Sequence, residues 1–121
     1  MKGSSSRRPE QVAETLRQVL TDALLRGEVR DPRVGLVTVT GILVTGDLSH
    51  AKVMVSLGGS EADKTRALEG LRSAAGFLRS RAARALTTRT VPELHFELDT
   101  GLEHAARIEE LLQEIRREER D

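Results

Sequence analysis

The chain has 121 residues and balances 19 basic against 19 acidic side chains. This length predicts one domain with its own core, and the absence of cysteine excludes disulfides, thiolate metal sites and cysteine catalysis. Without tryptophan or tyrosine, base stacking on an aromatic platform has few residues to use, and without an apolar run of transmembrane length the chain is expected to be cytoplasmic, with no membrane partner.

The first element expected is a helix that begins at Pro9, because proline suits the first helical position. Apolar residues recur at every third or fourth position as far as Leu24, which gives this helix one apolar stripe. Gly27 then favours a C-terminal stop. The small and polar residues 1–6 that precede the helix are expected to be disordered.

Two strands are expected next. Residues 36–44 are rich in β-branched types and apolar on both faces, which predicts a central strand with a bulge or a close approach at Gly41. A hairpin loop that includes His50 follows, and no catalytic partner for this histidine is recognisable. Residues 51–57 then alternate between apolar and polar types, which predicts a second strand with one buried face.

Residues 67–89 organise the rest of the chain, because they combine helical periodicity with many arginines. Gly70 and Gly76 interrupt the apolar pattern, and each costs about 1 kcal/mol against alanine inside a helix. Two helices that meet at a kink formed by Ala74, Ala75 and Gly76 are therefore expected. Such a break offers free N–H groups and a positive helix end beside guanidinium groups, and all three attract phosphate.

The last elements expected are a strand at 93–99, where apolar and polar residues alternate strictly, and an acidic helix after it. The element order is then α-β-β-α-α-β-α. A three-stranded sheet covered by helices is the simplest α+β arrangement that buries the apolar faces. The domain is expected to span residues 7–116, with a frayed end at 117–121.

The net charge of zero hides a segregation along the chain. Residues 64–92 hold seven basic side chains and one acidic, a balance of +6, whereas residues 93–121 hold four basic and ten acidic, a balance of −6. Such asymmetry favours a basic face for a polyanion. On charge alone, Arg81 and Arg84 are expected RNA contacts, and the alternative is that the arginines only solvate an ordinary amphipathic helix.

The outward face of the strand at 93–99 suggests a second alternative. Glu93, His95, Glu97 and Asp99 share that face, and such donors suit Mn²⁺, Mg²⁺ or Zn²⁺ in a metal-dependent hydrolase. Adjacent outward residues lie about 7 Å apart along a strand, so all four cannot bind one ion. No metal and no cofactor are therefore expected, and a solvated strand face is the simpler interpretation.

Six segments of the chain resemble the bacterial ribosome-binding factor A family. They follow the family's order and spacing from about residue 7 to about residue 115, and it is this shared order that makes the resemblance specific. The segments are Arg8-Pro9-x-x-Val12-Ala13, Asp31-Pro32-Arg33-x-Gly35-x-x-Thr38-Val39-Thr40, Asp47-Leu48-x-x-Ala51-Lys52-Val53-x-Val55-Ser56, Ala74-x-Gly76-Phe77-x-Arg79, Arg89-x-Val91-Pro92-Glu93-Leu94-x-Phe96-x-x-Asp99 and Arg107-Ile108-x-x-Leu111-Leu112.

The resemblance implies a single type II KH-like domain, in which the kink at Ala74-Ala75-Gly76 replaces the usual GXXG loop. It implies no enzyme activity, but binding to the small (30S) ribosomal subunit and its 16S rRNA during late maturation and 5′-end processing, often linked with cold adaptation. It also implies a functional link to assembly GTPases, and the protein is expected to be a monomer. Carried over to matching positions, the implied RNA contacts are Arg33, Lys52, Arg72, Arg79 and Arg89.

A protein-interaction module is the alternative function from a different class. The acidic last helix would then dock a protein partner. Ordinary solvated glutamates explain the same charge, and point reversals at Glu109 and Glu110 separate these two interpretations.

Overall fold

The structure, a computed structural model, describes residues 8–120, apart from the side chains of residues 102–107 and 120. Over that range the chain forms helices and strands in the expected order. They are α1 (Pro9–Leu25), β1 (Val37–Val44), β2 (His50–Leu57), α2 (Glu61–Ser73), α3 (Ala75–Ala85), β3 (Glu93–Leu98) and α4 (Gly101–Arg120). The disorder expected for residues 1–6 and the domain start at residue 7 lie outside the described residues.

α1 confirms the helix predicted from the start of the sequence. Pro9 is its first residue, and Gly27 follows its end with a φ of +68°, a left-handed conformation that glycine adopts without strain. The predicted apolar stripe faces the core. Its fully buried members are Val12, Leu16, Leu20 and Ala23.

The sheet has the strand order β1-β2-β3, with β2 antiparallel to β1 and parallel to β3. The bulge predicted at Gly41 is confirmed, because the pairing register shifts between Val39 and Gly41 and leaves Thr40 as the extra residue. The prediction that the first strand is central is wrong. β1 is an edge strand whose apolar residues pack under α1 on one face only, while Leu43 is 68% exposed.

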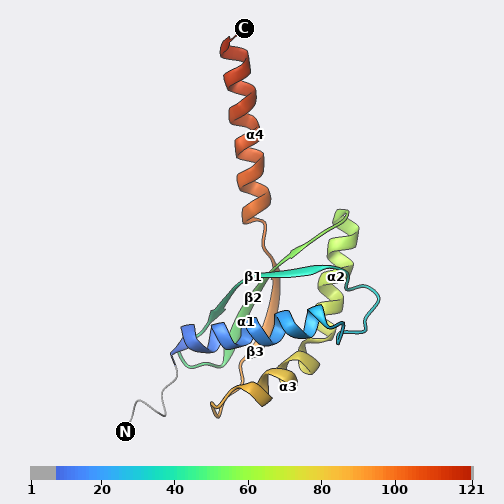
Figure 1. Cartoon of the computed structure of the whole chain (residues 1–121), viewed down its shortest axis with the longest axis vertical. Helices are drawn as coiled ribbons and strands as arrows, with labels where there is room; N and C mark the ends of the chain where they lie inside the picture. Colours follow the sequence, from blue (N-terminus) through green and yellow to red (C-terminus); the bar gives the residue numbers. More distant parts are fainter. Residues whose placement is uncertain (1–7, 121) are drawn as a thin grey trace.

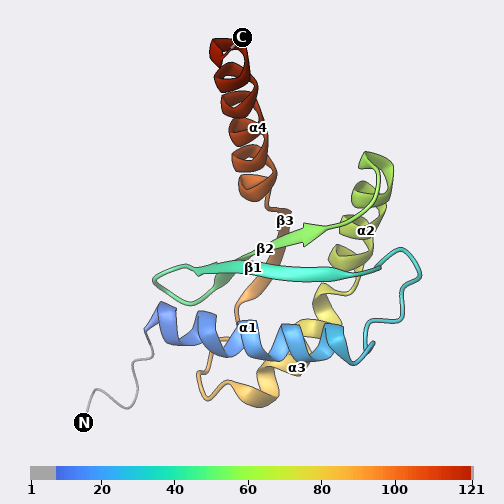
Figure 2. The ribbon, with the colours of Figure 1, turned by 45° about the horizontal axis from the view of Figure 1, so that its top comes forward.

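Helices α1, α2 and α3 cover one face of the sheet (Figures 1 and 2). Their buried side chains form one core with those of the strands, and its largest members are Phe96, Leu16, Leu20, Leu71, Leu78, Val12, Val53 and Val55. We call the other face the open face of the sheet, because exposed or half-buried side chains such as Lys52 and Met54 project from it. The predicted helical cover therefore holds for one face of the sheet.

The kink predicted between the two basic helices is confirmed. Ala74 alone separates α2 from α3, with φ −88° and ψ 0°. Gly76 lies in the first turn of α3, where a Cβ would meet nothing within 4 Å. Packing requires Gly70 instead, because a Cβ there would lie 2.7 Å from Cγ2 of Val34, in the loop after α1. The glycine of α2 thus lets that loop approach closely.

α4 extends away from the sheet (Figure 1). It continues to Arg120, four residues past the expected domain end at 116, so the segment expected to fray is helical as far as it is described. Four apolar side chains that share one side of α4 are exposed. The exposed fractions are 47% for Ile108, 48% for Leu111, 41% for Leu112 and 52% for Ile115.

Candidate nucleic-acid interface

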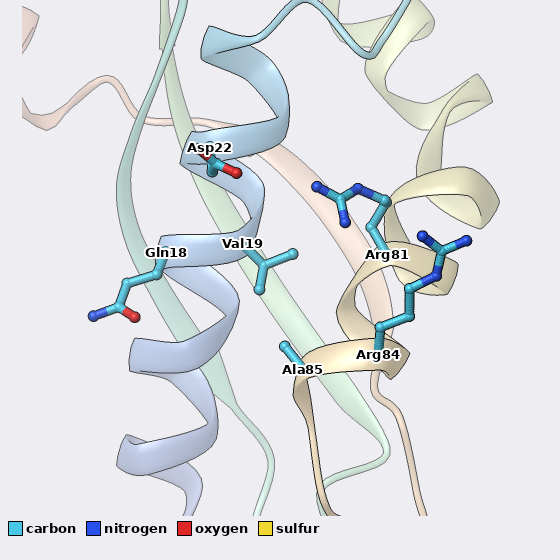
Figure 3. Close-up of a pocket in the computed structure, with 6 residues that line it drawn as sticks. All are labelled: Gln18, Val19, Asp22, Arg81, Arg84 and Ala85. Atoms are coloured by element: carbon cyan, nitrogen blue, oxygen red, sulfur yellow. The ribbon is translucent and has the colours of Figure 1, made fainter.

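A groove runs between α1 and α3, beside the loop that follows α1. Its two adjoining pockets, of about 430 and about 760 Å³, share Arg81 and Arg84, and Figure 3 shows these arginines reaching from α3 beside α1. We call the pair of pockets the α1–α3 groove. Its lining residues are Gln18, Val19, Asp22, Arg26, Glu28, Arg30, Phe77, Arg81, Arg84 and Ala85.

Helix periodicity explains why these side chains converge. Arg81 and Arg84 are three residues apart, which places them on one side of α3. In Figure 3, Val19 of α1 points toward the short side chain of Ala85, which leaves open space between the two helices. The groove is therefore formed by a small residue at the helix contact and by long cationic residues around it.

Arg81 forms the strongest ion pair of the groove. Its Nε lies 2.6 Å from Oε1 of Glu28, and its Nη2 donates to Oε2 of the same carboxylate over 3.2 Å. Both side chains are about three-quarters buried. This two-point geometry fixes the loop after α1 to α3. Arg81 thus positions the groove, and part of its charge is already compensated.

Two other arginines of the groove present different electrostatics. Within residues 8–120, Arg30 and Arg84 are exposed and have no hydrogen-bond or ion-pair partner. Phe77, the one exposed aromatic side chain of the described chain, lines the same pocket and is 46% exposed. The groove therefore combines two unpaired guanidinium groups, which suit phosphate, with a ring that is available for stacking.

The arginines beside the kink are held by backbone carbonyls. Arg72 donates from Nη2 to the Phe96 oxygen over 3.1 Å, and Arg79 donates from Nε and Nη2 to the Val91 oxygen over 3.1 and 2.8 Å. These bonds tie α2 and α3 to β3 and to the segment before it. Ala74, the N-cap of α3, offers no side-chain acceptor to the amides of the first turn. Two predicted RNA contacts therefore also have a structural task.

Arg33 belongs to a separate network in the loop after α1. Its Nε and Nη2 donate to the two carboxylate oxygens of Asp31 over 3.0 and 2.6 Å, and its Nη2 also donates to Oγ of Ser73 over 3.3 Å. The side-chain hydrogen bonds from Arg33, followed by the bond from its backbone N–H, lower the pKa of Asp31 from 3.8 to about 2. The guanidinium group of Arg33 is thus largely occupied by hydrogen bonds within the protein.

This pKa predicts an acid dependence of stability. Because the folded pKa of Asp31 lies below its ordinary value of 3.8, the ionised carboxylate stabilises the fold above about pH 4, and this contribution disappears as the pH falls toward 2. Asp31→Asn should therefore lower the free energy of unfolding at pH 6 and have a much smaller effect near pH 2, where the carboxyl group is already largely protonated in the unfolded chain and about half protonated in the folded one. Urea unfolding of both proteins between pH 2 and 6 measures this, and an unchanged difference across the range would contradict it.

Lys52 lies apart from the arginines. It projects from the open face of the sheet, where its Nζ is 3.4 Å from Oε1 of Glu97. Arg89 is exposed in the segment between α3 and β3, without a partner among the described residues. The seven predicted contacts therefore occupy several surfaces: Arg81 and Arg84 meet in the groove, and Arg33, Arg72 and Arg79 surround the α2–α3 junction.

The four-residue metal face proposed for β3 is not assembled. Glu97 faces Lys52, and Asp99 accepts from Oγ1 of Thr40 over 2.6 Å and from the Gly101 N–H over 2.9 Å. These hydrogen bonds, with that from Thr40 the larger, lower the pKa of Asp99. A metal-dependent hydrolase that uses all four side chains is thus incompatible with the geometry.

His50 was expected in the hairpin loop, and this placement is wrong. His50 is the first residue of β2, and its Nδ1 lies 3.0 Å from Nε2 of His95. The two histidines are 45 residues apart, so only the pairing of β2 with β3 brings them together. The sequence alone could not predict this contact, because it does not show in which register β2 and β3 pair.

The sequence interpretation also missed three residues of the groove: Arg26, Arg30 and Phe77. Arg26 and Arg30 lie outside the basic segment 64–92, and both follow the end of α1. A signal was present in the sequence, since one of only two aromatic residues stands in the arginine-rich helix. Its exposure, rather than its type, separates it from the buried Phe96.

No helix in the described part of the chain is long and apolar enough to span a bilayer. The family model for ribosome-binding factor A matches residues 8–112. A ribosome-binding factor A from Desulforamulus reducens is 46% identical over 94% of both chains, and one from Thermomicrobium roseum is 48% identical over 93% of this chain and 87% of its own.

Solved structures agree with the sequence relatives. The crystal structure of ribosome-binding factor A from Thermus thermophilus has a TM-score of 0.62 and 27% identity, covering 76% of this chain and 97% of its own. A solution structure of a Thermotoga maritima protein with the same proposed assignment has a TM-score of 0.67 and 30% identity, covering 76% and 87%. The chain therefore belongs to the ribosome-binding factor A family and has its KH-like fold.

Proposed function

We propose that the protein binds the small (30S) ribosomal subunit through its 16S rRNA and acts in late maturation and 5′-end processing of that RNA. Family membership supports this role. A further structural neighbour has a TM-score of 0.55 and 29% identity, covering 70% of this chain and 88% of its own. It is a homology model of Thermus thermophilus ribosome-binding factor A, fitted into a cryo-EM map of its complex with the 30S subunit. We also infer a cytoplasmic location, where ribosomes are assembled.

The observation that carries the proposal is the α1–α3 groove. Arg30 and Arg84 bind phosphates of the RNA backbone, because their guanidinium groups are exposed and unpaired within the described chain. Phe77 stacks on an unpaired base beside them. Arg81 holds the groove open through Glu28. In this proposal the arginines supply most of the affinity for RNA, and the ring of Phe77 recognises an unpaired base.

The remaining predicted residues extend this interface. Arg89, exposed and unpaired in the described structure, is a further phosphate contact. Arg33, Arg72 and Arg79 contribute positive charge near the α2–α3 junction while they keep their internal bonds. Lys52 contacts RNA only where the ribosome also reaches the open face of the sheet. The contact surface is thus centred on α3 and the loop after α1.

No catalysis is assigned to the protein. The family is defined by ribosome binding rather than by a reaction, and the groove needs no metal or cofactor for the role proposed. We infer that the protein acts as a monomer, that assembly GTPases promote its release, and that its action supports growth in the cold. Each of these three inferences rests on the family resemblance.

Co-sedimentation with purified small subunits tests the proposal. We expect binding to immature subunits that differs from binding to mature ones, because the RNA fold that is recognised changes during maturation. Three to five phosphate contacts predict that affinity falls roughly 10- to 100-fold between 50 and 200 mM salt. Absence of binding to either form at low salt would overturn the proposal.

The alternative function, docking of a protein partner by α4, gains support from one observation. Four apolar side chains, at Ile108, Leu111, Leu112 and Ile115, are half exposed along one side of an acidic helix. A chain that ends at residue 107 distinguishes the two functions in the same sedimentation experiment. Retained binding assigns the subunit contact to the groove, whereas failure of a folded truncated chain to bind assigns it to α4.

A further inference from the structure

A cluster of metal-ligand types lies at one end of the open face of the sheet. It consists of His50, the first residue of β2, and of Glu93 and His95 of β3. The parallel register pairs His50 with Glu93, and His95 lies two residues further along the same face. All three side chains are about half exposed. The strand pairing thus presents three donors together at an accessible place.

The separations of the donor atoms match a metal centre. Nδ1 of His50 lies 3.0 Å from Nε2 of His95 and 3.4 Å from Oε1 of Glu93, and the last two atoms are 3.7 Å apart. A circle through three points with these separations has a radius of about 2.0 Å. Bonds from Zn²⁺ to imidazole nitrogen or carboxylate oxygen are about 2.0 to 2.2 Å long. An ion close to the plane of the three atoms therefore reaches all of them.

We propose that His50, Glu93 and His95 form a three-ligand site for a divalent transition-metal ion, with Zn²⁺ as the best fit. Two imidazoles and one carboxylate suit Zn²⁺ and its late first-row neighbours, whereas Mg²⁺ and Ca²⁺ prefer all-oxygen sites. Three protein ligands leave a coordination position open to water or to another oxygen donor. The site is distinct from the α1–α3 groove, which lies on the helical side of the sheet.

The backbone around the ligands is already fixed. The N–H of Glu93 donates to the Ser49 oxygen over 2.9 Å, and the N–H of His50 donates to Oγ1 of Thr45 over 3.1 Å. The ion therefore has little chain to order when it binds, and such preorganisation favours affinity. The nearest lysine on this face, Lys52, faces Glu97, so its charge is partly compensated.

The ring contact itself points to the same chemistry. Two imidazole nitrogens 3.0 Å apart share one hydrogen, because one nitrogen has to donate and the other has to accept. When the hydrogen moves to the other nitrogen of its own ring, both rings stay neutral and both facing nitrogens are free to bind one metal ion. Binding then joins the start of β2 to the start of β3, which are 43 residues apart in sequence at His50 and Glu93. We therefore expect the ion to raise the thermal stability of the domain.

Titration of the untagged full-length protein with ZnCl₂ by calorimetry tests the site. We expect one Zn²⁺ per chain, an increase in the melting temperature on binding, and d–d absorption when Co²⁺ is used instead. His50→Ala and His95→Ala should each weaken binding at least about tenfold, because even residues that only support metal ligands typically contribute that much. Their spectra by circular dichroism should match the wild type, since both side chains are exposed.

His104→Ala is the matched control, because it removes the third histidine from α4 and leaves the β2–β3 pair unchanged. It should bind Zn²⁺ as the wild type does. Equal affinity of all three histidine variants and the wild type would overturn the proposal, as would the absence of one-to-one binding. Because the readouts involve no ribosome, they remain valid if the RNA-binding function fails its own test.

Discussion

The double variant Arg30→Glu/Arg84→Glu should bind the small subunit roughly 100-fold more weakly than the wild type at low salt. Both guanidinium groups are exposed and unpaired in the described structure, so their charge is available to a ligand and is not used in the fold. Removing a phosphate-binding arginine should also make the dependence of log affinity on log salt shallower, by about 0.7 per phosphate on single-stranded RNA. Co-sedimentation at several salt concentrations measures both quantities.

The control for this variant is Arg116→Glu/Arg117→Glu, which changes the net charge by the same amount on α4. Both positions are exposed and lie far along the chain from the groove. Similar weakening by this control would show that net charge or α4, and not the groove, governs binding. Neither pair of reversals removes an interaction within the described chain, so both proteins should keep wild-type stability within about 0.5 kcal/mol.

The fold was predictable to the extent that local patterns determine it. Pro9 marks the start of α1 and Gly27 follows its end, because of their own backbone preferences. Period-two alternation identifies β2 and β3 without knowledge of their neighbours. The kink between the basic helices was predictable from small residues. The position of β1 at the edge of the sheet was not predictable. The strand order depends on which side of β2 the chain reaches after α2 and α3, where β3 then pairs.

The candidate site was predictable in residue type but not in arrangement. Arg84 was identified from charge, and the groove confirms that it is exposed beside Arg81. Whether an arginine is free depends on partners remote in sequence: Arg81 meets Glu28, 53 residues away, and Arg79 meets a backbone carbonyl. A local sequence pattern cannot show which residues so far apart in sequence become partners. His50 and His95 show the same limit, since a strand register joins them.

β3 is also where a single substitution should cost the most stability. Phe96 is 1% exposed and is the largest fully buried side chain in the described part of the chain, and both α2 and α3 pack against its strand. Phe96→Ala should lower the free energy of unfolding by about 3 to 5 kcal/mol, because it removes buried apolar surface and leaves a cavity. Domains of this size have only about 5 to 15 kcal/mol in total. Urea unfolding at 25 °C measures the difference.

The neighbouring position on the same strand supplies the control. His95 projects from the opposite face, so His95→Ala in the absence of metal should change stability by less than about 1 kcal/mol. The contrast between two adjacent residues is the signature of a strand with one buried face. A cost below about 1 kcal/mol for Phe96→Ala would show that β3 does not seal the core beneath α2 and α3. The carbonyl of Phe96 that holds Arg72 would then not be a fixed anchor, and the junction of the basic helices would lose its support.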